Sequence, residues 1–475
     1  MSIIIGRAEE QRLLERYEHS GRSEFVVVYG RRRIGKTFLV RQYFKDRFAF
    51  SYVGRHNQSR EEQLDSFAQA LAHQGGMAYI PKLSNWHEAF SLLQKHLEGM
   101  SKKRRKVVFI DEIPWMDNPK SDFISALETF WNAWADFRDD ILLIACGSAT
   151  SWIVNKIFKN RGGLYNRVTC QVYLRSFNLC EVEAYLRSRR FVWDRFQIAQ
   201  CYMTMGGIPF YLSLLDPSQS LTQNIDRLFF ASANAQLRTE FDELFAVLFT
   251  HHENYLKVIR LLAERREGFT RIEISGRTGL GGSSLTTILS ELERCDFIVS
   301  YQKWGSKVKD TIYRLADAYT LFYYKFVEGQ DAKDPHRWQH LLGKPQVSAW
   351  QGFSFELLCL LHLEQIKRAL GISGMATYAS AWRSLSKDLS TQIDLVIDRA
   401  DRIINLCEMK FSTQQYAITR AYEEHLRQRM SLFAAESKTR KGLALTMVTT
   451  FGLLPNSHAG IVGSEVVLDQ LFAAS

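Results

Sequence analysis

The sequence has few of the residues that interrupt or cross-link a protein chain. It contains 8 prolines and 7 cysteines among 475 residues. The cysteines are odd in number, scattered, and never spaced as CxxC. This pattern argues against a disulfide framework and against a cysteine-based zinc site, and it predicts free thiols in a reducing compartment.

Long apolar runs are also lacking. No run approaches the about 18 residues that a membrane-spanning helix requires. The opening "MSIIIGRAEE" is too short and too acidic for a signal peptide. We therefore expect a cytoplasmic protein without a membrane partner.

Length and charge set wider limits. A chain of 475 residues exceeds one hydrophobic core, so we expect about three domains. With 46% hydrophobic and 24% charged residues the composition is that of a soluble globular protein. The net charge of +10 permits attraction to nucleic acid but fits a solvated basic surface equally well.

The stretch "FVVVYGRRRIGKTFLVRQYF" predicts a phosphate-binding loop. A β-branched run leads into Gly30-x-x-x-x-Gly35-Lys36-Thr37, and an amphipathic helix follows, which is the context that makes this motif specific. Gly30 and Gly35 let the backbone wrap the phosphates of ATP, Lys36 neutralises phosphate oxygens, and Thr37 offers a hydroxyl to Mg²⁺.

Two further predicted strands end in polar residues that suit the same site. "KVVFIDEIPWM" ends in Asp111 and Glu112, and "DDILLIACGSATSWI" ends in Gly147 and Ser148. Asp111 suits magnesium coordination, Glu112 is placed to polarise the attacking water, and Ser148 to sense the γ-phosphate or orient that water. Because these strands end at one edge of a parallel sheet, the residues are expected to meet there.

These motifs resemble those of the archaeal-type ATPases of the AAA+/STAND superclass. The likeness rests on "IIIGRAEE", the GRRR-x-GKT loop, the DE and GS strand ends, "GGLYNRVTCQVYLRSF" and "MGGIPFYL". It implies that Arg7 contacts the base or ribose, that Arg167 acts as an arginine finger in cis or in trans, and that the protein is a homo-oligomer. A surface ion pair for Arg167 remains an open alternative.

The middle of the chain changes its pattern twice. Residues 181–249 have helical spacing and suit a lid over the nucleotide. Residues 255–315 predict a helix, a turn, a second helix with one apolar face, and then two β-rich runs around a turn at Trp304-Gly305-Ser306. This order is the winged-helix arrangement. The apolar face consists of Leu285, Ile288, Leu289 and Leu292.

Nucleic-acid contact by the winged helix is one of two open interpretations. The outward helix face offers Ser284, Thr287, Glu291 and Arg294, which is poor in basic residues, whereas the wing carries Lys303, Lys307 and Lys309. The wing can contact phosphates, but base-specific recognition is not indicated. The alternative is a structural adapter between domains. The basic run "SKKRRK" likewise fits a nucleic-acid patch or a solvated turn.

The carboxyl-terminal part predicts a second site of phosphoryl chemistry. "QIDLVID" and "RIINLCEMK" have the character of two core strands joined by the turn "RADR", so Asp394 and Glu408 meet on adjacent strands. Lys410 shares the face of Glu408 by the period of two. Asp394 and Glu408 can hold Mg²⁺ or Mn²⁺ and activate a water, with Lys410 stabilising the developing charge. Gln392 is a further candidate.

These residues resemble the PD-(D/E)xK nuclease superfamily. "ID" carries the first acid and "EMK" the E-x-K, and Glu356 matches the acid on the preceding helix, while Ile393 departs from the usual small residue or proline. The chance alternative, ordinary strand-edge charges, stays open. It is weakened because a charge inside "NLCEMKF" or inside an apolar helix is costly without a partner or metal.

The sequence thus predicts an α/β protein: an ATPase that controls a metal-dependent nuclease cutting DNA more than RNA, in a defence or mobile-element setting. The alternative is a regulatory STAND-type NTPase whose carboxyl-terminal domain binds DNA or a protein without cutting. The expected parts are an ATPase core (1–178), a helical lid (179–250), a winged helix (251–328), a linker (329–350) and a restriction-endonuclease-like domain (351–475).

Overall fold

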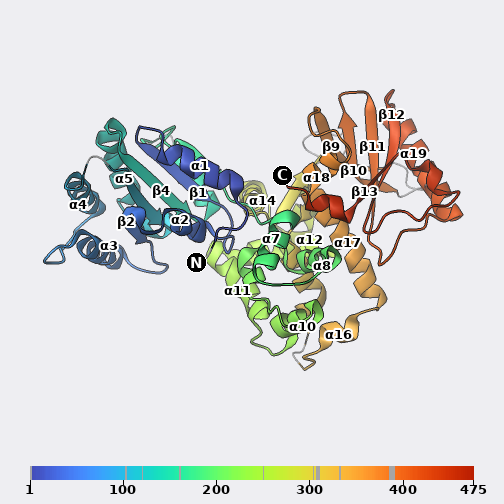
Figure 1. Ribbon diagram of the computed structural model, residues 1–475, viewed down its shortest axis with the longest axis horizontal. Helices are drawn as coiled ribbons and strands as arrows, with labels where there is room; N and C mark the ends of the chain where they lie inside the picture. The colour runs from blue at the N-terminus through green and yellow to red at the C-terminus, as the bar shows by residue number, and fades with distance from the viewer. Residues whose placement is uncertain are drawn as a thin grey trace. The chain divides into compact units, whose positions relative to one another are not determined.

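The computed structural model divides the chain into two compact units, residues 1–175 and residues 176–475. Each unit has β-sheets of its own (Figure 1). In the described part of the chain, none of the helices has both the length and the apolar character needed to cross a membrane. The described residues are 3–101, 104–119, 121–159, 162–249, 251–302, 304–305, 311–330, 333–384 and 391–474.

The first unit is built on a five-stranded parallel sheet with the order β2-β3-β4-β1-β5. Every residue of β3 and β4 is buried, as expected for a parallel sheet covered on both faces. The strands are β1 Glu24–Tyr29, β2 Phe48–Val53, β3 Lys106–Asp111, β4 Ile141–Gly147 and β5 Cys170–Tyr173.

Helices pack on this sheet, and the order of its strands places the predicted ATP-binding residues at one edge. The main core cluster contains residues of four helices, α3, α4, α5 and α6, packed with apolar strand residues. Since β4 lies between β1 and β3, the loop after β1 and the acids at the end of β3 lie at the same edge. The helices are α1 Ala8–Glu18, α2 Lys36–Phe44, α3 Arg60–Gly75, α4 Trp86–Glu98, α5 Phe123–Ala133 and α6 Thr150–Ile153.

The second unit begins with a run of helices where the sequence predicts helical structure. Side-chain capping boxes fix the starts of α7, α8 and α10, because each capping side chain satisfies a backbone N–H that the first helical turn leaves without a partner. The helices are α7 Leu179–Ser188, α8 Arg195–Met205, α9 Pro209–Ser213, α10 Leu221–Ile225 and α11 Gln236–Leu248.

Residues 252–315 form helices and a small antiparallel sheet with the order β6-β8-β7. The predicted apolar face lies on α14, where its four residues are buried. The predicted turn joins β7 and β8, but Lys303, Ser306, Lys307 and Lys309 lie outside the described residues. The elements are α12 His252–Glu264, β6 Phe269–Thr270, α13 Arg271–Thr278, α14 Gly282–Arg294, β7 Ile298–Tyr301 and β8 Ile312–Leu315.

The range 329–350 differs from the expected linker. It contains α16 (Arg337–Leu341) and the first residues of α17 (Pro345–Leu361). Trp338 and Trp350 are buried, with ring centroids 5.7 Å apart. They also pack against rings of the preceding helical segment, α15 Ala318–Phe322 and the turn that follows it. Although the range is polar in composition, its two buried tryptophans pack it against the rest of the second unit.

The carboxyl-terminal part is a mixed five-stranded sheet with the order β13-β12-β11-β10-β9 (Figure 1). Strands β9, β10 and β11 are antiparallel, whereas β11, β12 and β13 are parallel. Helix α17 contacts β11, and α19 connects β11 to β12. The further elements are α18 Leu363–Ala369, β9 Thr377–Arg383, β10 Gln392–Arg399, β11 Ile403–Lys410, α19 Arg420–Ser437, β12 Gly442–Thr449 and β13 Ser464–Val467.

Candidate functional site

The loop between β1 and α2 has the backbone that a phosphate cradle needs. Gly30 has φ 143°, and a Cβ there would lie 2.3 Å from the carbonyl oxygen of Leu174, so only glycine fits. Gly35 has φ 87° and caps the start of α2. Lys36 is buried, and its Nζ donates to the carbonyl oxygens of Gly30 at 3.0 Å and Arg31 at 2.8 Å. The lysine is thus held inside the loop.

Thr37 and Asp111 meet across the sheet, as the sequence predicts. Thr37 Oγ1 donates to Asp111 Oδ2 at 2.7 Å. Burial raises the pKa of Asp111, and the hydrogen bond from Thr37 opposes that rise. A hydroxyl and a carboxylate side by side at a phosphate loop are hard oxygen donors, so these residues fit a magnesium ion.

Glu112 and Ser148 form the next pair at this edge. The backbone N–H of Ser148 donates to Glu112 Oε2 at 3.1 Å, and its hydroxyl donates to Oε1 at 2.5 Å. Glu112 has φ 48°, a left-handed conformation that is uncommon outside glycine. The contact orients the carboxylate that sequence analysis assigns to the attacking water.

Arg7 and Arg167, to which the family resemblance assigns roles at the ATP site, have different surroundings. Arg7 is buried, and its Nη2 donates to the carbonyl oxygen of Ile34 in the phosphate loop at 3.3 Å. Arg167 has a side chain that is 45% exposed, and it pairs with Asp136 at 3.0 Å. Arg7 therefore touches the loop itself, whereas the contact of Arg167 is the surface ion pair that the sequence left open.

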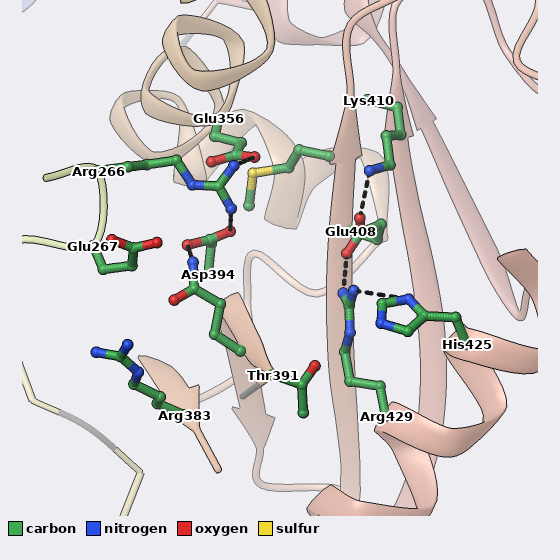
Figure 2. A pocket seen from close by; sticks show the side chains of 12 residues that line it. Arg266, Glu267, Glu356, Arg383, Thr391, Asp394, Glu408, Lys410, His425 and Arg429 are labelled. Carbon is green, nitrogen blue, oxygen red and sulfur yellow. Dashed lines mark hydrogen bonds and ion pairs between the residues drawn. The ribbon is translucent and has the colours of Figure 1, made fainter. Parts of the chain in front are cut away.

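A second site lies in the carboxyl-terminal unit, in a polar pocket of about 300 Å³ (Figure 2). Residues from α17, β10, β11 and α19 line it, together with the turn that follows α12. All four residues of the predicted acid and lysine set are present. The lining residues are Arg266, Glu267, Glu356, Arg383, Thr391, Gln392, Asp394, Glu408, Met409, Lys410, His425 and Arg429.

The hairpin register brings Asp394 and Glu408 together. Leu395 pairs with Cys407, so the next residues outward on the two strands are Asp394 and Glu408. Lys410 lies 2.9 Å from Glu408 through Nζ and Oε1. Asp394 and Glu408 therefore lie on one hairpin, whose strands are joined by a tight turn as the sequence predicts.

Helix α19 supplies partners of Glu408 that the sequence analysis missed. Arg429 Nη1 and the hydroxyl of Tyr422 both donate to its carboxylate. Burial raises the pKa of Glu408, but Lys410 and Arg429 outweigh burial and hold that pKa below its usual range. A signal was present: Tyr422, His425 and Arg429 follow one another at i, i+3 and i+7, the spacing of one helix face.

Glu356 and Asp394 share a different cation. Arg266 Nη1 lies 3.2 Å from Glu356 Oε1, and Arg266 Nη2 lies 3.6 Å from Asp394 Oδ2 (Figure 2). Arg314, which is almost completely buried, has Nη2 3.9 Å from Glu356 Oε2. Burial and the nearby Asp394 raise the pKa of Glu356 to about 8.

The carboxylates of the pocket are chemically suited to bind a divalent cation, although in this structure they form ion pairs with arginine and lysine side chains. Asp394 and Glu408 are hard oxygen donors of the kind that Mg²⁺ and Mn²⁺ prefer. Within the described part of the chain, Glu356 Oε2 is buried and accepts no hydrogen bond. Yet no group of three or more His, Cys, Asp or Glu in that part is arranged to hold a metal. Gln392 Nε2 donates to Asp394 Oδ1 at 3.2 Å, which helps to orient that acid.

Comparison with known proteins shows that the first site lies within an ATPase-like domain. Residues 5–215 match the model of the ATPase domain predominantly from Archaea. An uncharacterized protein of Methanocaldococcus jannaschii is 24% identical over 329 residues, covering 68% of this chain and 69% of that protein. An uncharacterized ATP-binding protein of the same organism is 33% identical over 45 residues, covering 10% of this chain and 76% of that protein.

A solved structure gives the same picture of the fold. The Walker-type ATPase of Pyrococcus abyssi covers 68% of this chain and 96% of its own, with a TM-score of 0.50 and 18% identity. At that identity the match concerns the fold. Together with the domain model, it confirms the prediction of a P-loop ATPase domain that binds ATP.

Proposed function

We propose that the ATPase domain of residues 5–215 controls a metal-dependent nuclease in the carboxyl-terminal part of the same chain, with DNA as the preferred substrate. The observation that carries this proposal is the convergence of Glu356, Asp394, Glu408 and Lys410 in one pocket. They come from helix α17 and from the hairpin of β10 and β11, which follows it in the sequence and is brought to it by the fold.

The pocket offers the groups that phosphodiester cleavage needs. A divalent cation held by Asp394 and Glu408 would lower the pKa of a bound water and so supply the nucleophile. Lys410 would stabilise the charge that develops on the phosphate. Arg383, which also lines the pocket, would attract the nucleic-acid backbone.

The ATPase site is assigned corresponding roles. Lys36 would neutralise phosphate oxygens, Thr37 and Asp111 would hold magnesium, and Glu112, held by Ser148, would activate water. Arg7 would transmit base or ribose binding to the loop through its contact with Ile34, and Arg167 would act as a finger in a homo-oligomer. The roles of Lys36, Thr37, Asp111 and Glu112 rest on the contacts described above and on the motif, whereas those of Arg7 and Arg167 rest on the family resemblance.

The middle of the chain is assigned two further roles in this proposal. Helices α7 to α11 would serve as the lid of the ATPase. Residues 252–315, with helices α12 to α14 and the sheet β6-β8-β7, would serve as a winged helix that contacts DNA phosphates. Supporting this, the order helix, strand, helix, helix and hairpin is that of winged-helix folds.

The proposal is tested by cleavage assays with plasmid, linear duplex and single-stranded DNA, with Mg²⁺ or Mn²⁺, with and without ATP. Asp394→Ala and Lys410→Ala are expected to abolish cleavage. Asp398→Ala is the matched control, because Asp398 lies on the same strand and pairs with Lys441 outside the pocket. Lys36→Ala, which removes ATP hydrolysis, shows in which direction ATP acts on cleavage.

A second candidate function is a regulatory NTPase whose carboxyl-terminal domain binds DNA or a protein partner without cutting. One observation favours it: Arg266, Lys410 and Arg429 already neutralise the carboxylates of the pocket. Normal ATP hydrolysis without cleavage of any substrate by the wild type would decide for this candidate.

A further inference from the structure

One guanidinium in the nuclease-like pocket, that of Arg266, comes from outside the carboxyl-terminal part that supplies most of the lining. Arg266 lies in the turn between α12 and β6, 90 residues before Glu356. Its two terminal nitrogens face one oxygen of Glu356 and one oxygen of Asp394 (Figure 2). A positive group at Asp394 competes with the divalent cation that Asp394 and Glu408 are proposed to hold.

Electrostatics favours a positive charge next to Glu356 and Asp394. Charges on Glu356 and Asp394 would repel, and burial penalises the charged form of Glu356. Arg266 faces both side chains and offsets these effects. A divalent cation at Asp394 would offset the repulsion in the same way, so the arginine and the cation compete for Asp394.

Arg266 and Arg314 differ in how firmly they are held. Arg314 is 1% exposed, and its guanidinium stacks 4.8 Å above the ring of Phe353. The side chain of Arg266 is 41% exposed, and its contact with Asp394 at 3.6 Å is longer than a hydrogen bond. Exposed ion pairs contribute little to stability, so moving Arg266 out of the pocket costs far less free energy than moving Arg314 out of its buried position.

The turn that carries Arg266 is anchored to its own segment. Arg265 points away from the pocket: it donates to the carbonyl oxygen of Gly268 at 2.7 Å and its guanidinium lies 3.9 Å from the centroid of the Phe269 ring. The hydroxyl of Tyr301 on β7 donates to the carbonyl oxygen of Glu267 at 2.7 Å. Any displacement of residues 252–315 therefore moves Arg266 with them.

We propose that Arg266 is an intramolecular plug, a guanidinium that holds Glu356 and Asp394 in place of a divalent cation and withdraws when the segment 252–315 moves. This inference rests on the proposed function, since it assumes that Asp394 binds a divalent cation together with Glu408. It assigns regulation of the nuclease site to a contact between two parts of the second unit. DNA binding to the segment is the event that would withdraw the plug.

Binding of Mn²⁺ to the full-length protein, measured by electron paramagnetic resonance of the free ion, tests the plug without relying on activity. Arg266→Ala is expected to bind Mn²⁺ about tenfold more tightly than the wild type, the factor that 1.4 kcal/mol represents. Arg277→Ala is the matched control, because Arg277 lies on α13 and pairs with Glu264 instead of the pocket acids. Arg266→Lys keeps the charge and serves if the alanine variant fails to fold; its shorter reach predicts an intermediate affinity.

The outcomes separate the plug from the proposed function. Tighter binding in Arg266→Ala that Asp394→Ala abolishes supports the plug. Equal binding by the wild type and Arg266→Ala, still abolished by Asp394→Ala, overturns the plug and leaves the metal site standing. Absence of Mn²⁺ binding in every variant overturns both the metal site and the plug.

Discussion

The contact between Arg429 and Glu408 predicts a large loss of stability when Arg429 is replaced by methionine. The two side chains are 14% and 13% exposed. Methionine is a long unbranched side chain that removes the charge and leaves most of the packing. Removing one partner of a buried ion pair costs about 3–5 kcal/mol. Because Lys410 still faces Glu408, we expect a loss of about 2–3 kcal/mol in the free energy of unfolding at pH 7.

The same contact predicts how that loss depends on pH. The folded-state pKa of Glu408 lies below its usual 4.5, since Lys410 and Arg429 outweigh the effect of burial. A depressed acid pKa contributes stability that is present above the unfolded-state pKa and is lost as the pH falls through the folded-state pKa. The difference between the wild type and Arg429→Met is therefore complete at pH 7 and shrinks below pH 4.5.

Urea unfolding followed by tryptophan fluorescence measures this loss. Trp382 reports on the relevant core, with its ring centroid 5.4 Å from that of Phe433 on α19. Arg427→Met is the control, because Arg427 lies on the same helix, is 62% exposed and pairs with Glu423. It is expected to change stability by less than about 0.5 kcal/mol.

A double variant tests whether the unpaired charge of Glu408 causes the loss. Adding Glu408→Gln to Arg429→Met is expected to recover part of the loss, because the double variant no longer buries an incompletely paired carboxylate. Two results would refute the argument: a loss for Arg429→Met no larger than for Arg427→Met, or a further loss when Glu408→Gln is added.

Two further predictions concern the other acids. Ser148→Ala removes the hydroxyl that holds Glu112, and we expect kcat of ATP hydrolysis to fall about tenfold, or 1.4 kcal/mol, with KM for ATP unchanged; steady-state kinetics that show a raised KM instead would contradict this role. Glu356 has its pKa raised to about 8 by burial and by Asp394, so its contribution to stability is complete below pH 4.5 and is lost as the pH rises through 8. Glu356→Gln is expected to flatten that decline, which urea unfolding at pH 5, 6.5 and 8 measures, and an unchanged decline would show that another group is responsible.

Local sequence was enough to predict several of the contacts within the two candidate sites. The Gly30 to Thr37 loop lies between a strand and a helix, and both elements are present. Thr37 meets Asp111 because parallel strands end at one edge of a sheet. Asp394 and Glu408 meet because the spacing and the apolar pattern of two strands define one hairpin. Each of these inferences depends on the residue repeat within one strand or helix, or on a short loop between neighbouring elements.

Other features could not be predicted in this way. The range 329–350 has the composition of a linker, yet Trp338 and Trp350 bury it against aromatic residues of a preceding helix. Arg429 lies in a helix whose charge pattern also fits a solvated surface, and only the packing of that helix on the sheet turns it toward Glu408. Such contacts depend on which helix face meets the sheet.

The sequence by itself determined the phosphate loop, its acidic partners, and the hairpin that carries Asp394, Glu408 and Lys410, because period and spacing along one chain specify which neighbours share a face. Only the tertiary structure decided that Arg266 reaches Glu356 and Asp394. An ion pair between residues so far apart in the sequence leaves no periodic signal, since it depends on how two distant segments of one unit pack against each other.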